Sequence, residues 1–194
     1  MFIVIEGIDG SGKSTLAENL CNELKKLGKK AQKFSEPTNF ETGKYIRKFL
    51  KGEIELSKLE QIQAFISDRE LSVKNNILPN LKENYVVLDR YFFSTAAYQG
   101  STEYSPEFIL ELNLSKKFPF PDLLFYLEIN PSSALDRLKH RGGKLEIFES
   151  IQKLTEISEN FQKILPNSTI RLNGLDKQEI ILEKCITYIL KHSK

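Results

Sequence analysis

A glycine-rich segment near the N-terminus has the residue types and spacing that hold a polyphosphate. Residues 7–15 contain the pattern G-x-x-x-x-G-K-[ST], which ends at Ser14. The glycines let backbone N–H groups turn toward an anion, and the positive end of a following helix adds to the attraction. Lys13 can place a charge near the β- and γ-phosphates, and the Ser14 hydroxyl can ligate Mg²⁺. The predicted triphosphate-binding loop comprises Gly7, Ile8, Asp9, Gly10, Ser11, Gly12, Lys13, Ser14 and Thr15.

Asp9 is an acidic residue inside this loop. A carboxylate that faced bound phosphates would be repelled by them, so we expect Asp9 to face a second ligand and to accept a hydrogen bond from it. A cap or turn role is the alternative for an Asp at such a position.

The flanking segments supply what the loop requires. Apolar residues 2–6 predict a strand, and leucines at helical spacing predict a helix over 16–27. Further strands are predicted at 29–34, 85–88, 122–129 and 168–172. Helices are predicted around 45–50, 105–117, 145–165 and 176–190, and another begins at 130. A longer helix is predicted over 58–78, with Ser57 as its N-terminal cap. A chain of 194 residues suits one α/β domain with a sizeable core.

Composition excludes several classes of partner. The chain has 28 basic and 26 acidic residues, so no strong field favours nucleic acid or an acidic membrane. No apolar run reaches the roughly 18 residues of a membrane span, and no signal-peptide pattern precedes the first strand. Cys21 and Cys185 lie in separate helical patterns and are expected to be reduced thiols, which favours a cytoplasmic protein.

Arginine is scarce in this chain, with six arginines against 22 lysines. A chain that uses Lys as its ordinary cation should keep Arg where a planar, bidentate fork is needed. The arginines are therefore candidates for ligand contacts. The alternative for each is an arginine on the surface that contacts no ligand and persists by neutral drift. They are Arg47, Arg69, Arg90, Arg137, Arg141 and Arg171.

Other candidate residues follow the third predicted strand. Because ligands sit beyond the carboxyl ends of strands in an open parallel sheet, Asp89 and Arg90 should lie near the phosphate loop. Asp89 suits an acid near Mg²⁺, with a turn cap as the alternative. Residues 92–100 carry too many polar groups for a core element and suit a small-ligand pocket. Phe65, at helical spacing with Ile62 and Ile66, is by default a core residue.

The basic run 137–144 contains two adjacent glycines and predicts a mobile loop, with solvated charge as the alternative. His140 has no metal-ligating partner at a suitable spacing and is expected on the surface.

Several of these segments together resemble the thymidylate kinase family over nearly the whole chain. They are the phosphate loop, Glu36-Pro37, Ile46-Arg47, Phe65 with Arg69, Asp89-Arg90-Tyr91 and Ser94-Thr95-Ala-Ala-Tyr98-Gln99. The resemblance implies a three-layer P-loop nucleoside monophosphate kinase fold, with five parallel strands in the order 2-3-1-4-5, helices on both faces and a small lid. Residues 1–194 would be one domain, with the phosphate loop at 7–15 and the lid at about 137–149.

The activity implied is transfer of the γ-phosphoryl of MgATP to dTMP, which gives dTDP for dTTP biosynthesis. ATP and dTMP would be the small-molecule partners, Mg²⁺ the metal, and the protein a cytoplasmic homodimer. By resemblance, Phe65 stacks on thymine and Arg69 hydrogen-bonds its edge, while Thr95 and Gln99 lie against the base. Tyr98 crowds the 2′ position, and Asp9 approaches the 3′-hydroxyl.

The remaining roles are also carried by the resemblance. Arg47 and Arg90 would grip the acceptor phosphate, with Glu36, Pro37 and Ser94 completing the dTMP site. Arg137 and Arg141 fall in the lid over ATP, and Arg141 is the expected partner of the transferring phosphoryl. The implied metal site is Ser14 with Asp89, and the implied catalytic residues are Lys13, Asp89, Arg90 and Arg141.

The chain departs from the family pattern at two places. Ser35 stands where many bacterial members have Arg, with Thr38-Asn39 in place of Gly-Gly. The lid reads Glu146-Ile147-Phe148-Glu149 where Asp-Arg-x-Glu is common, which leaves Arg137, Arg141 and Lys144 as candidates for the transferring phosphoryl.

Two alternative functions are kept. One is a small-molecule P-loop kinase with a different acceptor. The other is a GTPase-like switch, against which the chain has no N-K-x-D sequence, and Asp89 is followed by Arg-Tyr where a switch would have x-x-Gly.

Overall fold

The core of the protein is one parallel sheet of five strands. The computed structural model describes residues 1–142 and 146–193. The strands are β1 (Phe2–Glu6), β2 (Ala31–Ser35), β3 (Tyr85–Asp89), β4 (Leu123–Glu128) and β5 (Ile170–Asn173). They lie in the order β2-β3-β1-β4-β5 with parallel pairing throughout, which confirms the predicted topology.

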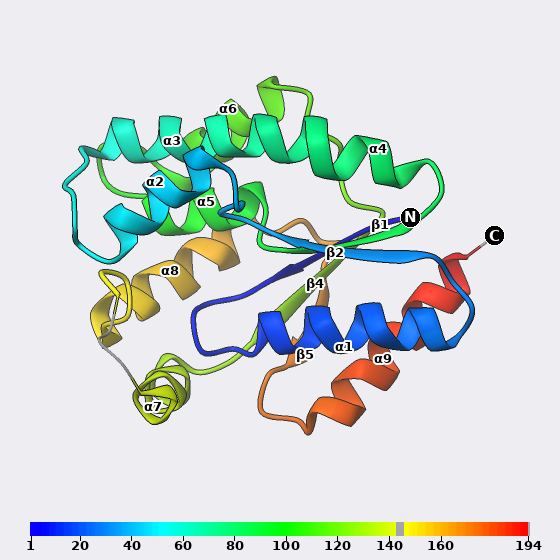
Figure 1. Ribbon diagram of the computed structural model, residues 1–194. Coiled ribbons are helices and arrows are strands. Elements are labelled where there is room, and N and C mark those ends of the chain that lie inside the picture. The colour runs from blue at the N-terminus through cyan, green and yellow to red at the C-terminus, as the bar shows by residue number, and fades with distance from the viewer. Residues whose placement is uncertain (143–145, 194) are drawn as a thin grey trace.

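Helices cover both faces of the sheet (Figure 1). Helices α1 (Lys13–Lys26) and α9 (Gln178–His192) pack on one face against alternate strand residues such as Ile3, Val87 and Phe125. The helices on the other face contact the intervening strand residues. They are α3 (Lys58–Ser72), α5 (Phe92–Gln99), α6 (Pro106–Ser115) and α8 (Ile151–Ile164). Burial on both faces explains why β1, β3 and β4 are continuous apolar runs.

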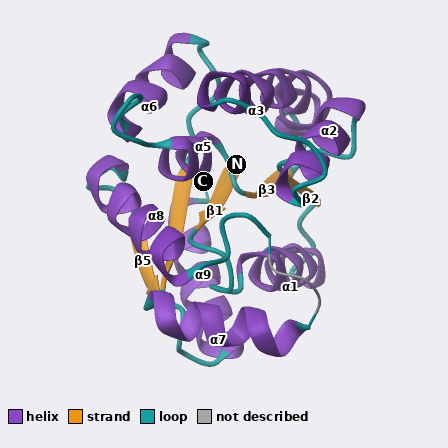
Figure 2. Cartoon of the chain, turned by 90° about the vertical axis from the view of Figure 1, so that its left-hand side faces the viewer, coloured by secondary structure: helices purple, strands orange, loops and turns teal. Residues whose placement is uncertain are grey.

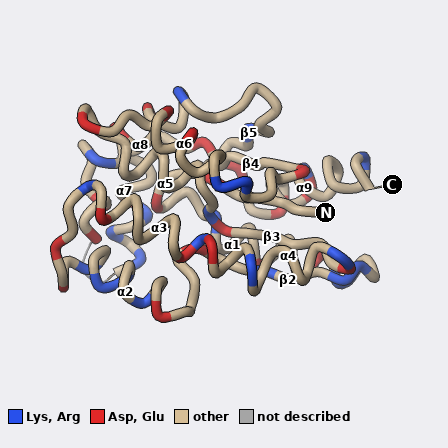
Figure 3. The backbone as a smooth tube through the Cα atoms, turned by 90° about the horizontal axis from the view of Figure 1, so that it is seen from above, with Lys and Arg blue, Asp and Glu red and all other residues tan. Residues whose placement is uncertain are grey.

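The remaining helices surround one end of the sheet. Figure 2 faces the end at which β1 and β3 finish, where α2 (Glu41–Leu50), α7 (Pro131–Arg141) and α8 lie around the strand ends. Cys21 and Cys185 are buried free thiols between α1, α9 and the sheet. Basic and acidic positions are interspersed along the chain (Figure 3). Over the described ranges, no helix has both the length and the apolarity to cross a bilayer.

The long helix after Ser57 begins as predicted. Ser57 accepts a hydrogen bond from the Glu60 backbone, and the Glu60 side chain accepts one from the Ser57 backbone, which forms a capping box. The helix continues past the predicted end at 78. It passes through a π-helical turn, η1 (Val73–Ile77), into α4 (Leu78–Leu81).

The prediction of a helix from 145 was wrong at its N-terminal end. Helix α8 begins at Ile151, because the Ser150 side chain caps it by accepting from the Lys153 backbone. Before it, Glu149 accepts a hydrogen bond from the backbone of Glu146, and the Ile147 backbone donates to the carbonyl of Leu50. The prediction of a mobile loop over 137–144 was wrong for residues 137–141, which continue helix α7 (Pro131–Arg141). Gly143 and Lys144, the rest of that prediction after Gly142, lie with Leu145 outside the described residues.

The expectation that residues 92–100 are too polar for a core element was also wrong. Every residue of α5 is buried. Ser94 and Thr95 have hydrogen-bond partners on neighbouring elements, so their burial costs little. Gln99 differs, because neither of its side-chain polar atoms has a hydrogen-bond partner among the described residues.

Candidate active site

The phosphate loop turns sharply between β1 and α1. Gly10 and Gly12 adopt φ values of 81° and 102°, in the left-handed region that favours glycine. A Cβ atom on Gly10 would lie 2.4 Å from the carbonyl oxygen of Ala134, so no larger residue fits there. Lys13 is buried and donates to the carbonyl of Ile8 over 2.8 Å. Burial, aided by repulsion from Arg90, lowers the pKa of Lys13 to about 8.

Ser14 and Asp89 meet behind this loop. Pairing of β1 with β3 sets Asp89 beside Ile5, and the Ser14 hydroxyl donates to Asp89 Oδ2 over 2.5 Å. The other carboxylate oxygen, Oδ1, is buried without a hydrogen-bond partner in the described part of the chain. A hydroxyl beside a free carboxylate oxygen is a donor set that suits Mg²⁺, which takes few protein ligands and completes its shell with substrate oxygens and water. The residues therefore fit the expected metal.

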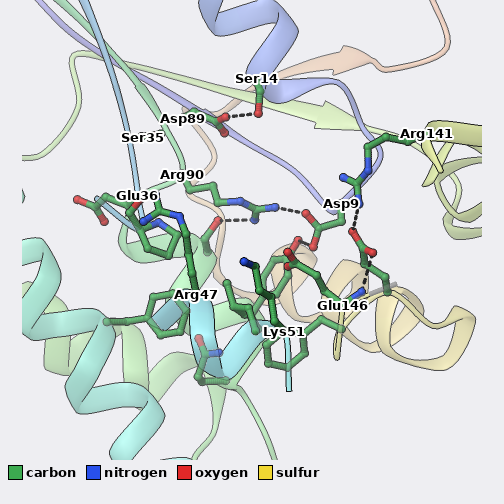
Figure 4. Close-up of a pocket in the computed structure, with 18 residues that line it drawn as sticks. Asp9, Ser14, Ser35, Glu36, Arg47, Lys51, Asp89, Arg90, Arg141 and Glu146 are labelled. Carbon is green, nitrogen blue, oxygen red and sulfur yellow. Dashed lines mark hydrogen bonds and ion pairs between the residues drawn. The ribbon is translucent and has the colours of Figure 1, made fainter. Parts of the chain in front are cut away.

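A cavity of about 350 Å³ lies beyond the carboxyl ends of the strands (Figure 4). Its volume is in the range of small-molecule sites. Many of the predicted site residues line it: Asp9, Ser14, Glu36, Pro37, Arg47, Phe65, Asp89, Arg90, Ser94, Tyr98, Gln99 and Arg141. Glu146, Phe148 and Glu149, which fall in the expected lid, also line it, as does Ser35, where the chain departs from the family pattern. Leu50 and Lys51 are lining residues that the sequence did not indicate. Residues distant in sequence thus converge on one cavity.

Arg69 and Thr95 lie behind the cavity wall and do not line it. Arg69 is 1% exposed, and its guanidinium forms an ion pair with Glu36 over 2.7 Å. It also donates to Asn113 over 2.6 Å and to Thr95 over 3.0 Å. The network fixes Glu36 at the cavity wall, so Arg69 organises this side of the site.

Asp9 and Arg90 form an ion pair inside the cavity (Figure 4). Arg90 has a left-handed backbone, with φ 69°, and its guanidinium lies 4.9 Å from the centre of the Tyr98 ring. The Tyr98 hydroxyl donates to Asp9 over 3.0 Å. Burial opposes the charge on Asp9, but Arg90 and Lys13 outweigh it and hold the pKa of Asp9 below its usual value. Asp9 is therefore a cavity residue; it lies in a turn, as the alternative expected, but the residue that caps α1 is Gly12.

Glu6 is a functional-site residue that the sequence reasoning missed. It is fully buried at the end of β1 and accepts hydrogen bonds from the backbones of Tyr91 and Ser94 and from the Ser94 hydroxyl. Burial raises the pKa of Glu6 to about 7, against the opposing effect of these hydrogen bonds. Glu6 therefore fixes the start of α5, next to Arg90. A carboxylate that ends an apolar strand was the available signal.

The loop after β2 is held by two side chains. Arg47 donates to the backbone carbonyls of Pro37 and Thr38 and, over 3.3 Å, to Asn39. Asp68, buried on α3 and also missed from the sequence, accepts from the backbone and hydroxyl of Thr38. The loop that borders the cavity is therefore fixed from both sides.

The lid arginines differ in position. Arg141 lines the cavity and pairs with the buried Glu149 over 2.9 Å. Arg137 does not line it and reaches the phosphate-loop carbonyls of Gly10 and Ser11 over 3.4 Å and that of Gly174 over 2.9 Å. Arg141 is thus the lid arginine nearer the predicted acceptor site.

One further candidate, Arg171, does not line the cavity. Arg171 on β5 pairs with Glu128 on the surface. His140 is exposed, as expected.

This architecture defines a class of protein. A parallel sheet in this order, a phosphate loop after β1, and a cavity that joins the loop to a polar, aromatic-lined pocket are the features of a P-loop kinase fold.

Comparison with known proteins gives the family. The sequence model described as Thymidylate kinase matches residues 5–185. A thymidylate kinase of Leptospira interrogans is 53% identical over 195 residues, which covers 100% of this chain and 96% of the relative. One from Leptospira borgpetersenii is 50% identical, with 99% and 94% covered, and a probable thymidylate kinase of Archaeoglobus fulgidus is 37% identical, with 95% and 92% covered. The chain belongs to the thymidylate kinase family.

Proposed function

We propose that the protein transfers the γ-phosphoryl group of MgATP to dTMP and releases ADP and dTDP, with residues 1–194 acting as one catalytic domain. The observation that carries this proposal is one cavity that is lined by Ser14 and Asp89 at the phosphate loop and also by Phe65 and Gln99. Arg47 and Arg90 line the same cavity. A nucleoside monophosphate fits these groups, because its base would meet the Phe65 ring and its phosphate the arginines.

The residues of the chain act chiefly by positioning and by neutralising charge. Lys13 and the loop amides hold the ATP phosphates, since the loop presents backbone N–H groups that face an anion. Arg90, already beside Asp9, presents its fork to the acceptor phosphate. Arg141 approaches from the lid side and stabilises the charge on the transferring phosphoryl.

Ser14 and Asp89 would hold Mg²⁺. The metal neutralises phosphate charge when it is bound with ATP. The contribution of the protein is the free Asp89 oxygen and the hydroxyl of Ser14.

At the base end, Phe65 offers a ring and Gln99 an amide whose atoms lack partners in the described structure. An unpaired buried amide costs free energy in the empty protein, and a thymine edge with one donor and one acceptor would satisfy both of its ends. Arg69 and Thr95 support this end from behind the wall and, with small shifts of side chains, would reach the base. Tyr98 and Asp9 would face the deoxyribose.

The activity is tested by following γ-labelled ATP. Incubation with dTMP and Mg²⁺ is expected to give labelled dTDP at a rate proportional to enzyme. Tight binding of guanine nucleotides without any labelled product would instead support the switch alternative.

A homodimer in the cytoplasm is part of the proposal. Exposed apolar side chains on α3, α4 and α6, such as Leu59, Leu78 and Phe108, support a self-association surface. Two buried free thiols support a reducing compartment. Size-exclusion chromatography with light scattering would test the dimer, and Leu78→Glu would be expected to weaken it.

A further inference from the structure

The loop formed by Pro37, Thr38 and Asn39 lies between two side chains that bind opposite edges of its backbone. Arg47, on α2, donates to the carbonyls of Pro37 and Thr38. Asp68, on α3, accepts from the Thr38 backbone N–H over 2.7 Å. Asp68 therefore binds the N–H of Thr38, and Arg47 binds its carbonyl.

Asp68 also binds two hydroxyl groups. Its Oδ1 accepts from Thr38 Oγ1 and from Thr42 Oγ1, each over 2.6 Å. Asp68 is 1% exposed, and Thr42 lies on α2, the helix that carries Arg47. Within the described residues, every group bound to Asp68 is a neutral donor on this loop or on α2. The carboxylate therefore fixes both the loop and the helix from which Arg47 projects.

The geometry leaves part of the Arg47 guanidinium available. Of its five N–H groups, three donate to Pro37, Thr38 and Asn39. The Nε–H and one terminal N–H remain, and Arg47 lines the cavity (Figure 4). These two N–H groups point away from each other, so a guanidinium whose orientation is set by backbone carbonyls can offer one of them to a phosphate with little loss of conformational freedom.

We infer that Asp68 is a positioning residue for phosphate recognition: by fixing Thr38 and Thr42 it sets the orientation in which Arg47 meets the acceptor phosphate. This inference rests on the proposed function, in which Arg47 contacts that phosphate. Two neighbouring residues of α3 would then support the site. Asp68 supports phosphate binding through Thr38, and Arg69 fixes Glu36 on the other side of Pro37.

The alternative is that Asp68 only joins α3 to α2 and contributes to stability. The two accounts differ in what they predict for ligands with and without a phosphate. A positioning role predicts weaker binding of dTMP and unchanged binding of thymidine, because thymidine lacks the group that Arg47 contacts. A purely structural role predicts equal effects on both ligands or none on either.

The test begins with dTMP turnover by the parent enzyme, whose absence would contradict the proposed function and not this inference alone. Asp68→Ala is then expected to raise KM for dTMP about tenfold or more, with KM for ATP and the dissociation constant of thymidine changed less than about twofold. Glu70→Gln, which removes a negative charge from the exposed side of α3, is the matched control and should leave all three values unchanged.

Two further variants keep the inference open to refutation if Asp68→Ala folds poorly. Asp68→Asn can accept from the Thr38 backbone and donate to both hydroxyls, so it should keep a dTMP KM within about threefold of the parent. Thr42→Val, which removes one donor, should raise that KM by a smaller factor than Asp68→Ala. A dTMP defect in Asp68→Asn as large as in the Ala variant would contradict a role through geometry.

A double-mutant cycle with Arg47 completes the test. If Asp68 acts through Arg47, Asp68→Ala should cost little further dTMP affinity in an Arg47→Ala background. Full additivity of the two losses, or equal loss of thymidine and dTMP binding, would overturn the inference.

Discussion

The Asp9 carboxylate and the Arg90 guanidinium form an ion pair inside the cavity, one residue from the phosphate loop and the other from the end of β3. The Tyr98 hydroxyl donates to the same carboxylate, and Arg90 also donates to Ser94 over 3.4 Å. Arg90 is therefore oriented before any substrate binds. An acceptor phosphate would meet a guanidinium already directed into the cavity.

Arg90→Ala is expected to lower kcat/KM for dTMP by about 100-fold or more. The substitution removes the guanidinium proposed to bind the acceptor phosphate and leaves Asp9 without its cationic partner. Arg90→Lys should recover only part of this loss, since an ammonium group lacks the planar pair of N–H groups that can bind a phosphate through two oxygens. Steady-state kinetics with dTMP as the varied substrate would measure both. Arg171→Lys, at a surface pair with Glu128, is the control and should behave as the parent. Full activity in Arg90→Lys would argue against a bidentate role.

Arg141→Ala is expected to lower kcat by about 100-fold or more with a small change in KM for dTMP, because its charge is needed chiefly on the transferring phosphoryl. Single-turnover measurements of dTDP formation would isolate this step. Lys139→Ala, on the exposed side of α7, should have no effect. Turnover of Arg141→Ala within about threefold of the parent would show that another group serves this role.

Gln99→Met is expected to stabilise the ligand-free protein while weakening dTMP binding. The buried amide of Gln99 has no partner among the described residues, and its replacement by a similar apolar volume should raise the free energy of unfolding by about 1 kcal/mol. Binding of dTMP should weaken about tenfold, because the base loses its amide partner. Urea denaturation and dTMP titration would measure the two effects, with exposed Gln63→Met as the control. A variant that is less stable and binds dTMP normally would contradict the assignment.

Glu6 should make the stability of the protein depend on pH. Its pKa is raised from 4.5 to about 7 in the folded state, so the folded protein binds the Glu6 proton more tightly than the unfolded chain does. The contribution of Glu6 to stability is therefore greatest below pH 4.5 and declines as the pH rises toward 7, by about 3 kcal/mol in all.

Glu6→Gln should remove this decline and be more stable than the parent at pH 8. Its carbonyl oxygen can still accept from the Tyr91 and Ser94 backbones, and its amide can donate to the Ser94 hydroxyl. The difference in unfolding free energy between variant and parent, followed from pH 4.5 to 8, gives the Glu6 contribution alone. A difference that stays constant with pH would show that Glu6 titrates normally.

Most of the fold could be predicted from the sequence, because its signals are local. The apolar runs at β1, β3 and β4 mark strands buried on both faces, and Ser57 with Glu60 marks the start of α3. The start of α8 could not be predicted in this way. Residues 146–149 bind Leu50 and one another, and these contacts are set by the tertiary structure.

Candidate site residues could be named from the sequence where a motif or a resemblance indicated them, as for Lys13, Asp89 and Arg90. The side chains that hold these groups were missed, because a buried carboxylate such as Glu6 or Asp68 acts through backbone groups that are distant in sequence. The polarity of α5 has two origins: Ser94, Tyr98 and Gln99 line the cavity, and the buried hydroxyls of Ser94 and Thr95 are satisfied by Glu6 and Arg69.

The central claim is that one cavity selects a thymidine monophosphate as phosphoryl acceptor. An ADP-release assay with MgATP against deoxythymidine, deoxyuridine, uridine, cytidine, guanosine and adenosine monophosphates tests it most directly. Fast turnover is predicted with dTMP, slower turnover with dUMP, and little with the others, because in the proposed binding mode the cavity residues Tyr98 and Asp9 would face the sugar, and Phe65 and Gln99 the base. Faster turnover with any other monophosphate, or no turnover that depends on an acceptor, would contradict the account.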